Sequence, residues 1–381
     1  QSMKSIILLI FTLTIVESRK IGLLFGSFGD VESCECVEHY CTNALTTLAN
    51  FEIPEPAFAK KYVGELIWKA GKKETMEMYK SISPSCNTSF QTNARAQANA
   101  VGSILDSMLP EEDRVSVFTG YNFVSGEGCP LNVTVVDQAR MALNAGMDIL
   151  LMVNQNNAQQ SNTTNGVSYE QLSDVIQSEE SAWKDMDVLG LDDYSQLQEF
   201  NELLVDYTEK QFNMLLPNVS ESDVCLLFAC HGNPSRLAKQ GDPAESYMRQ
   251  NYAYLEKHFL SRGFSDVSLA FQNHGGKGAP FPQNLFSWSS PPDTTVVPQI
   301  AEKSCTHVMI SGAISFVLDN SETLFDERID DIRMLGGKKE KVVVSPMFNA
   351  DQAFAKFLAG VLSESLSNPS STLRDVKKYG L

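Results

Sequence analysis

Several patterns are missing from this 381-residue chain, and each absence excludes a class of site or protein. No Cys-x-x-Cys pair occurs and no cysteine follows Cys305, which excludes an iron–sulfur cluster near the carboxyl end and argues against a zinc cluster. Lysine and arginine number 30 against 47 aspartates and glutamates, so the net charge is −17, and no basic stripe with interleaved aromatic residues occurs. We therefore exclude nucleic acid as a partner, because this surface repels a phosphate backbone. The acidity fits solubility and also the attraction of cations.

The amino end carries one short apolar run, Ile6–Val16, of about eleven residues. A membrane span needs about twenty. Lys4 precedes the run and the small residue Ser18 follows it, which predicts a secretory signal over residues 1–18. An uncleaved anchor is the alternative and would give the one expected association with a membrane. A first β-strand is a further alternative, although a better strand pattern, Lys20–Gly26, follows at once.

Sequons and cysteines agree with export. Four Asn-x-Ser/Thr sequons begin at Asn87, Asn132, Asn162 and Asn218. The eight cysteines include a tight amino-terminal group that could pair within itself or with later cysteines, and the sequence does not fix the pairing. The group and its later partners are Cys34, Cys36 and Cys41, then Cys86 and Cys129. We expect a glycoprotein that is secreted, or that reaches an organelle through the secretory pathway.

Short apolar runs of β type alternate with longer amphipathic stretches along the whole chain. This alternation predicts parallel sheets flanked by helices, an α/β fold. The expected strands are Ile21–Phe25, Val115–Phe118, Ile149–Val153, Val224–Ala229, Val267–Phe271, His307–Ile310 and Lys341–Ser345. Helical periods cover Ala94–Met108, Thr134–Ala145, Tyr194–Leu216 and Ser246–Arg262.

The two halves of the chain are similar strand–loop–helix series, so we expect two similar lobes with a cleft between them. The predicted boundaries are 19–200 for the first lobe and 201–350 for the second. Residues 351–381 would contribute a carboxyl-terminal helix, Asp351–Leu366, that packs back on the first lobe. Long irregular stretches are expected at Phe51–Ser89, Asn154–Asn165 and Gln272–Pro298.

Two strand-like runs in the second lobe end in side chains suited to proton and metal chemistry. The run from Leu227 ends at His231, followed by Gly-Asn-Pro, and a second run from Ile314 leads to Asp319 and Glu322. Side chains at the carboxyl ends of parallel strands line the ligand crevice, so we expect the imidazole and the carboxylate to face one cavity. The alternatives are a His231 satisfied by backbone hydrogen bonds, and an Asp319 that caps the next helix, which is the role we expect for it.

A helix that starts after Asn320 would carry several acids on one face. Glu322, Asp326 and Asp330 lie at i, i+4 and i+8. Like charges at this spacing repel unless a cation passes over them. The alternative is a solvated helix face with arginine counter-charges nearby.

Four segments resemble motifs of the ferrochelatase family. The first strand, Lys20-Ile-Gly-Leu-Leu-Phe-Gly-Ser-Phe-Gly29, is similar to the family's first strand and glycine turn. His231-Gly-Asn-Pro … Gly241-Asp-Pro resembles its His-Gly-Leu-Pro … Gly-Asp-Pro segment, and Phe316-Val-Leu-Asp319-Asn-Ser-Glu322-Thr-Leu looks like its Phe-Val-Ser-Asp-His-Ile-Glu-Thr-Leu motif. Ser161-Asn-Thr-Thr-Asn-Gly-Val-Ser-Tyr169 looks like its Ser/Thr-rich loop with one insertion. The resemblance runs in order from about residue 20 to 366.

The resemblance implies insertion of Fe²⁺ into protoporphyrin IX, a step of haem biosynthesis. His231 and Glu322 would be catalytic, because a neutral imidazole accepts a proton or binds Fe(II) and a carboxylate assists. Fe²⁺ is then a substrate, with no permanently bound cofactor, and porphyrin or haem and a divalent metal are the implied partners. The metal ligands would be His231, Glu322, Asp326 and Asp330. The substrate-binding residues would be Phe123, Asn122, Ser161, Asn320 and Phe281.

Departures from the family pattern motivate other functions. Asn320 stands where the family usually has His, and Asn122-Phe123 stands where many members have Arg-Tyr. The run Asn154–Gln160 gives a polar wall where a flat apolar macrocycle usually meets aromatic side chains. One alternative is a protein of the same fold that binds haem, another tetrapyrrole or a metal without catalysis. A cobalt-inserting chelatase is the other alternative.

Overall fold

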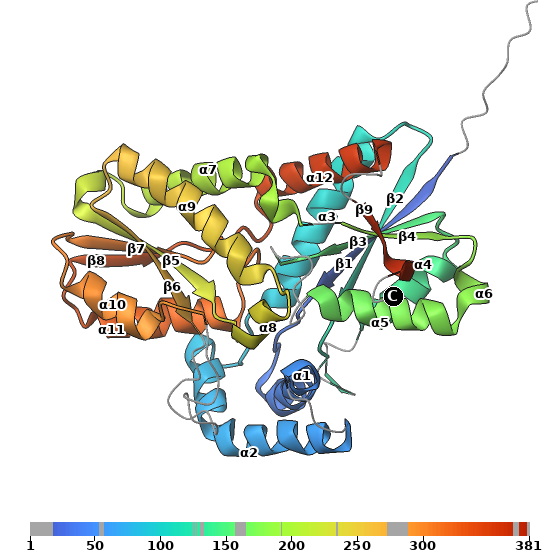
Figure 1. Cartoon of the computed structure of the whole chain (residues 1–381), viewed down its shortest axis with the longest axis horizontal. Helices are drawn as coiled ribbons and strands as arrows, with labels where there is room; N and C mark the ends of the chain where they lie inside the picture. The colour runs from blue at the N-terminus through green and yellow to red at the C-terminus, as the bar shows by residue number, and fades with distance from the viewer. Residues whose placement is uncertain are drawn as a thin grey trace, which may run out of the picture.

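The computed structural model describes residues 18–378, with gaps at 53–56, 125, 127, 130–132, 157–164, 192, 234, 273–288 and 369–372. Two sheets lie side by side with helices on their faces (Figure 1). This arrangement confirms the α/β fold of parallel sheets flanked by helices that the sequence predicts.

The first sheet has the strand order β2-β1-β3-β4-β9. Strands β1 to β4 are parallel and β9 is antiparallel, so this sheet is mixed. Strand β1 is buried over nearly its whole length because it has neighbours on both edges and helices on both faces. The strands are β1 Lys20–Ser27, β2 Arg114–Tyr121, β3 Ile149–Asn154, β4 Asp187–Leu191 and β9 Leu373–Asp375.

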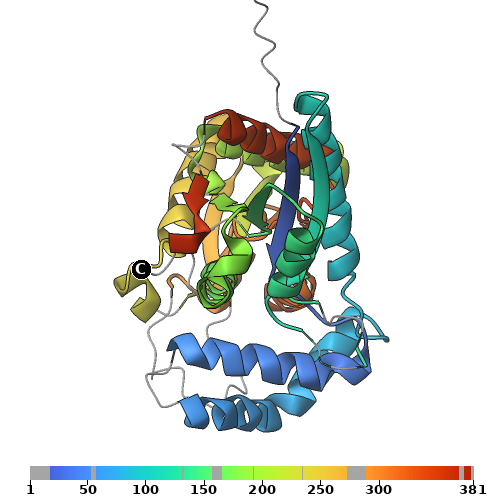
Figure 2. The same ribbon diagram turned by 90° about the vertical axis from the view of Figure 1, so that its right-hand side faces the viewer.

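The helices of the chain as far as β4 are η1 Cys34–Cys36, α1 Val37–Glu52, α2 Ala57–Ile82, α3 Phe90–Met108, α4 Val135–Asn144, α5 Asn165–Ser178 and α6 Glu180–Trp183. Helices α1 and α2 pack on one another and lie below both sheets (Figures 1 and 2). The irregular stretch expected at Phe51–Ser89 is therefore wrong for residues 57–82. Strong helix formers fill this segment, which favours a helix over a loop.

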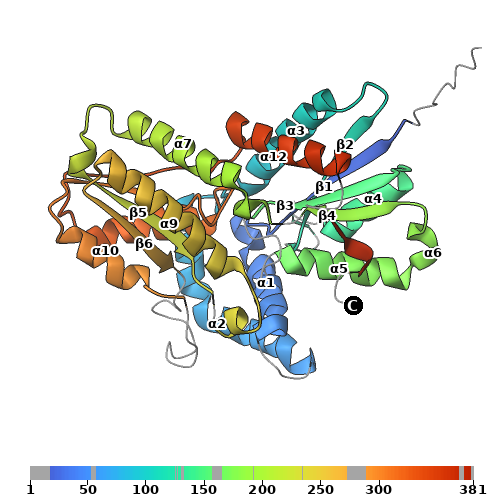
Figure 3. The same ribbon diagram turned by 45° about the horizontal axis from the view of Figure 1, so that its top comes forward.

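The second sheet has the order β6-β5-β7-β8 and is entirely parallel. Its strands are β5 Val224–His231, β6 Asp266–Gln272, β7 His307–Ser311 and β8 Lys341–Val344. Helices α7 and α9 cover one face and α10 and α11 the other (Figure 3). These helices and turns are η2 Tyr194–Gln196, α7 Gln198–Leu215, η3 Glu221–Asp223, α8 Ser235–Lys239, α9 Ala244–Arg262, α10 Asp293–Ala301, the π-helix η5 Thr323–Asp331 and α11 Ile332–Leu335.

Two of the stretches expected to be irregular are only partly described. Helix α10 begins at Asp293, so the prediction for Gln272–Pro298 is wrong in its last part. Residues 273–288 and 157–164 lie outside the described residues.

One apolar core joins the two lobes. It includes Phe25 and Val101 from the first lobe, Phe228 from the second, and Phe354 from α12 Gln352–Ser367. Helix α12 follows the second sheet in the chain but packs on α3 and also touches α7. After it come β9, at the edge of the first sheet, and η6 Val376–Lys378. The two sheets are thus fixed to each other through a shared interior.

Six of the eight cysteines form disulfides. The pairs are Cys34–Cys86, Cys36–Cys129 and Cys225–Cys305. Cys41 and Cys230 are free thiols. The sequence left the pairing of the amino-terminal cysteines open. In the structure, Cys34–Cys86 joins η1, which precedes α1, to the loop before α3, and Cys36–Cys129 joins η1 to the loop after β2.

Candidate active site

His231 ends β5 and is held in place by its neighbours. Its amide donates to the Ser315 hydroxyl at 3.0 Å, and its Nδ1 lies 3.2 Å from the side-chain oxygen of Asn233. A Cβ at Gly232 would lie 2.3 Å from the carbonyl oxygen of Gln272, so only glycine fits directly after the histidine. Asn233, which follows this glycine, holds the imidazole through Nδ1 and leaves Nε2 toward Glu322.

Glu322 lies in the first turn of the helical segment that begins at Ser321 and continues as η5. The side chain of Asn320 caps this segment, accepting from the amides of Glu322 at 2.9 Å and Thr323 at 3.1 Å. In return, the Thr323 hydroxyl accepts from the Asn320 amide at 3.0 Å. Asn320 thus has a capping role, and the substrate contact expected for it stays a prediction.

Asp319 does not cap this helix, so that prediction is wrong. Its carboxylate accepts from the side-chain amide of Asn349 at 2.8 Å and the backbone amide of Met347 at 3.3 Å. It also forms an ion pair of 3.2 Å with Arg328. Asp319 therefore ties η5 to the segment between β8 and α12.

The structure brings the two predicted catalytic residues together. His231 Nε2 and Glu322 Oε1 are 3.5 Å apart, and the side chains are 33% and 31% exposed. Burial lowers the pKa of His231, but the charge and hydrogen bond of Glu322, with smaller contributions from Asn233 and Asp326, raise it to about 9. The raised pKa favours the protonated form of His231 beside Glu322. Glu322 Oε2 is buried and has no hydrogen-bond partner within the described part of the chain.

The predicted acidic row continues from this pair along η5. Burial, then the charges of Glu322, Asp293 and Asp330, raise the pKa of Asp326 well above its usual range. Asp326 therefore lies close to both of its predicted neighbours. Asp330 also forms an ion pair with Arg333 at 2.5 Å, so part of the row has the counter-charge that a solvated face would have.

Two acids that sequence reasoning missed lie on the inner side of η5. Glu327 is fully buried and Asp331 is 2% exposed, and burial raises the pKa of both well above the usual range. Neither carboxylate oxygen of Glu327 has a hydrogen-bond partner among the described residues. The signal in the sequence was the repeat of two pairs of adjacent acids, Asp326-Glu327 and Asp330-Asp331. The α-helical period assumed for this segment does not predict which of these acids point inward, because the i→i+5 bonds of a π-helix place side chains at different angles around the axis.

Where the chain is described, no three His, Cys, Asp or Glu side chains gather closely enough to hold a metal ion.

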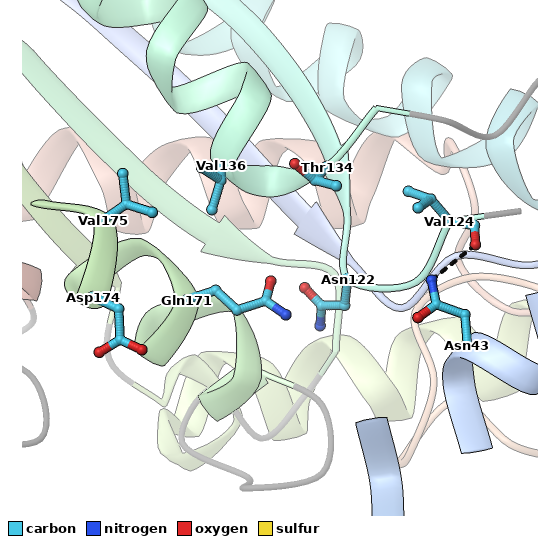
Figure 4. A pocket seen from close by; sticks show the side chains of 8 residues that line it. All are labelled: Asn43, Asn122, Val124, Thr134, Val136, Gln171, Asp174 and Val175. Atoms are coloured by element: carbon cyan, nitrogen blue, oxygen red, sulfur yellow. Dashed lines mark hydrogen bonds between the residues drawn. The ribbon is translucent and has the colours of Figure 1, made fainter. Parts of the chain in front are cut away.

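A cavity of about 480 Å³ lies at the carboxyl end of the first sheet and is lined mainly by polar side chains (Figure 4). Asn122, predicted to bind substrate, lines it, and so does the nearby amide of Gln171 on α5. Neither His231 nor Glu322 is among its lining residues. The whole lining is Asn43, Asn122, Val124, Thr134, Val136, Gln171, Asp174 and Val175.

Phe123, another predicted substrate contact, does not lie at an accessible wall. Phe123 is fully buried and its ring packs edge-on against Phe28 at 4.4 Å between centroids, so it belongs to the core. From sequence alone, an aromatic residue that follows a strand end fits a core position as well as a ligand-binding wall. The packing of Phe123 against Phe28 shows that it takes the core position. Ser161 and Phe281 lie outside the described residues.

In the parts of the chain that are described, no helix is both long and apolar enough to span a bilayer.

Comparison with solved structures finds proteins whose alignments cover most of this chain. SirB from Bacillus subtilis, solved with Fe³⁺, is 10% identical, covers 92% of this chain and 97% of its own, and superposes with a TM-score of 0.48. CbiX, described as the terminal enzyme of sirohaem biosynthesis in denitrifying bacteria, is 12% identical with a TM-score of 0.42, over 91% of this chain and 99% of its own.

Comparison with curated sequences finds distant relatives, each named ferrochelatase. The protein of Campylobacter concisus is 26% identical over 164 residues, which cover 42% of this chain, and the chain spans 46% of that relative's length. The protein of Leptospira borgpetersenii is 22% identical over 318 residues, 80% of both chains. The family model described as Ferrochelatase matches residues 20–366, nearly the whole chain. Because this match covers far more than half of the chain, the chain belongs to the ferrochelatase family.

Proposed function

We propose that this protein inserts a divalent metal ion into a tetrapyrrole, with Fe²⁺ and protoporphyrin IX as the substrates. The observation that carries the proposal is the contact between His231 and Glu322, residues 91 positions apart whose side chains meet at 3.5 Å. Membership of the family supports the reaction class. The carboxylates that continue from Glu322 to Asp326 and Asp330 support a cationic substrate.

The chemistry requires that two pyrrole N–H protons leave and that the metal loses its water. Glu322 Oε2, buried and unpaired among the described residues, can accept one of these protons. A dication that arrives along the row from Asp330 and Asp326 repels a protonated His231 and lowers its pKa, so that the imidazolium releases its proton to solvent, to which the side chain is 33% exposed. The released imidazole can then accept the second proton or ligate the metal. Each carboxylate binds the cation weakly, which suits a metal that must move on.

The test is metal insertion by the full, correctly oxidised chain, supplied with protoporphyrin IX and, in separate arms, Fe²⁺, Zn²⁺ or Co²⁺ without oxygen. Metalloporphyrin formation is followed by absorbance and by loss of porphyrin fluorescence. We expect His231→Ala and Glu322→Gln each to lower kcat by roughly 10²- to 10⁴-fold. Rates that stay at the wild-type level in both variants would refute the assignment, and a preference for Co²⁺ would favour a cobalt chelatase.

A second pair in the chain provides a matched control. His258 Nε2 lies 2.9 Å from Glu209 Oε1, with side chains 33% and 28% exposed, so its exposure resembles that of the site pair. His258→Ala removes the same chemical group from the surface of α9 and should leave the insertion rate unchanged.

Tetrapyrrole binding without insertion is the second candidate function. The observations that motivate it are the polar lining of the cavity beside Asn122 and the core position of Phe123, which depart from the aromatic wall expected at an insertion site. Titration with haem separates the two functions. A tight spectral change without metal insertion supports binding alone, and its absence removes this candidate.

We also propose that the protein enters the secretory pathway and is glycosylated. The three disulfides support this, since such bonds persist in oxidising compartments. The sequon residues Asn87 and Asn218 are exposed and therefore accessible to modification. Asn132 and Asn162 lie outside the described residues. Expression in a secreting cell, followed by a glycosidase digest, should give a smaller band, and unmodified protein retained in the cytosol would contradict the proposal.

A further inference from the structure

Asp30 is a buried carboxylate that connects three distant parts of the chain. It follows β1 in the first lobe and is 1% exposed. Its Oδ1 accepts from the Val31 amide at 2.7 Å and from the Tyr79 hydroxyl, on α2, at 3.0 Å. Its Oδ2 accepts from the Ser321 amide at 2.6 Å, across 291 residues of sequence. A buried carboxylate needs several donors to offset its lost hydration, and Asp30 has them.

The Ser321 amide is the first donor of the helical segment that carries Glu322. The amides of Glu322 and Thr323 are capped by Asn320, and the Leu324 amide bonds to the Asn320 carbonyl oxygen at 2.9 Å. The Ser321 amide has no acceptor inside its own helix, as is normal for a first turn. Asp30 provides that acceptor from the other lobe, and it does so one residue before the catalytic glutamate.

The surroundings of Asp30 hold it in place. The Tyr40 hydroxyl, on α1, donates to the Gly29 carbonyl oxygen at 2.7 Å. The Thr88 amide donates to the Val31 carbonyl oxygen at 3.3 Å, and Cys86, two residues earlier, forms the disulfide with Cys34. The loop that carries Asp30 is thus attached to α1 and to the segment before α3, so it can act as a rigid support.

We propose that Asp30 is a positioning residue which holds Glu322 against His231 by fixing the Ser321 amide at the start of the helix. Asp30 reaches neither side chain of the pair itself. Its effect on metal insertion therefore depends entirely on Glu322, and in this respect the inference rests on the proposed function. A small displacement of a catalytic group lowers a rate strongly, so the support from the first lobe matters.

The test is a double-mutant cycle on metal insertion with Asp30→Asn and Glu322→Gln. Alone, Asp30→Asn should lower kcat by roughly 10- to 100-fold, while KM for the porphyrin stays within about twofold. In the Glu322→Gln background the same change should have no further effect, because the group that it positions is already gone. Losses that multiply in the double variant would show a general structural role and overturn the proposal.

A second variant covers the case in which Asp30→Asn does not fold. Ser321→Pro removes the amide hydrogen that Asp30 accepts, together with the hydroxyl, and proline is well tolerated at the first position of a helix. Ser321→Ala keeps that hydrogen and is the matched control. We expect the proline variant to reproduce the loss in kcat and the alanine variant to remain near wild type. Equal rates in the two variants would overturn the proposal.

Hydrogen–deuterium exchange separates this inference from the proposed function. In Asp30→Asn, amides 321–324 should exchange faster than in the wild type, while those of α12 remain unchanged. If the wild type inserts no metal but amides 321–324 exchange faster in Asp30→Asn, the proposed function is refuted while the role of Asp30 in holding the start of the helix is retained. If exchange at 321–324 is unaltered, the positioning role is refuted whatever the activity.

Discussion

The ionisation of Asp30 should make the stability of this protein fall as the pH rises from 4 to 7. Burial raises the pKa of Asp30 from 3.8 to about 6, despite the opposing hydrogen bonds from Val31, Ser321, Tyr79 and Thr88. Between these two values the unfolded chain has lost the proton and the folded chain still holds it, so stability decreases with pH. The difference corresponds to about 3 kcal/mol in all, of which roughly 1 kcal/mol is lost between pH 5 and pH 7.

The assay is urea unfolding, followed by circular dichroism, of wild type and Asp30→Asn at intervals from pH 5 to 7. The wild type should lose roughly 1 kcal/mol relative to the variant over this range. Asp113→Asn is the matched control, since the hydrogen bonds from Arg19 lower the pKa of this buried carboxyl and its stabilisation is lost only as the pH falls through that lower value. The Asp113 difference should be flat from pH 5 to 7. An equally flat difference for Asp30→Asn would refute the raised pKa.

Three further outcomes are expected. Gly232→Ala should lower the unfolding midpoint and abolish metal insertion, because the new Cβ would clash with a backbone carbonyl oxygen. Gly360→Ala in α12 has open space around it and should be neutral or stabilising by about 0.5–1 kcal/mol. Equal effects of the two substitutions would contradict the packing argument. Alkylation of the unfolded, unreduced chain, read by mass spectrometry, should label Cys41 and Cys230 alone, and a third label would contradict the disulfide map. Glu327→Leu should raise the midpoint, because a buried acid without a partner among the described residues is replaced by an apolar group, and a lower midpoint would show that the acid is satisfied.

The sequence predicts the sheets and the central pair well because both follow from local patterns. Strands β1 and β5 are buried on both faces and therefore appear as continuous apolar runs. The carboxyl ends of parallel strands meet at one edge, which is why His231 and the segment before Glu322 could be expected to lie together. The three-residue strand β9 has no comparable pattern and was missed.

The rest of the site depends on contacts that no local pattern reveals. Asp30 takes its donors from positions 49 and 291 residues away, and nothing near it in the sequence marks it as buried. The π-helix changes which acids share a face, so Glu327 turns inward. The motif suggested a substrate contact for Asn320, but it did not reveal that the side-chain oxygen also accepts from two backbone amides and caps the helix.

The return of α12 and β9 to the first lobe sets the order in which the chain can complete its fold. During synthesis, β1 to β4 emerge first, but their sheet lacks its antiparallel edge strand and α3 lacks its helical neighbour until residues 352–375 have been made. The amino-terminal half therefore keeps part of its apolar surface exposed to solvent while the second sheet is being translated. Cutting the chain near residue 200 would separate that half from its own last pieces, so the two halves should be soluble and folded only when they are produced together.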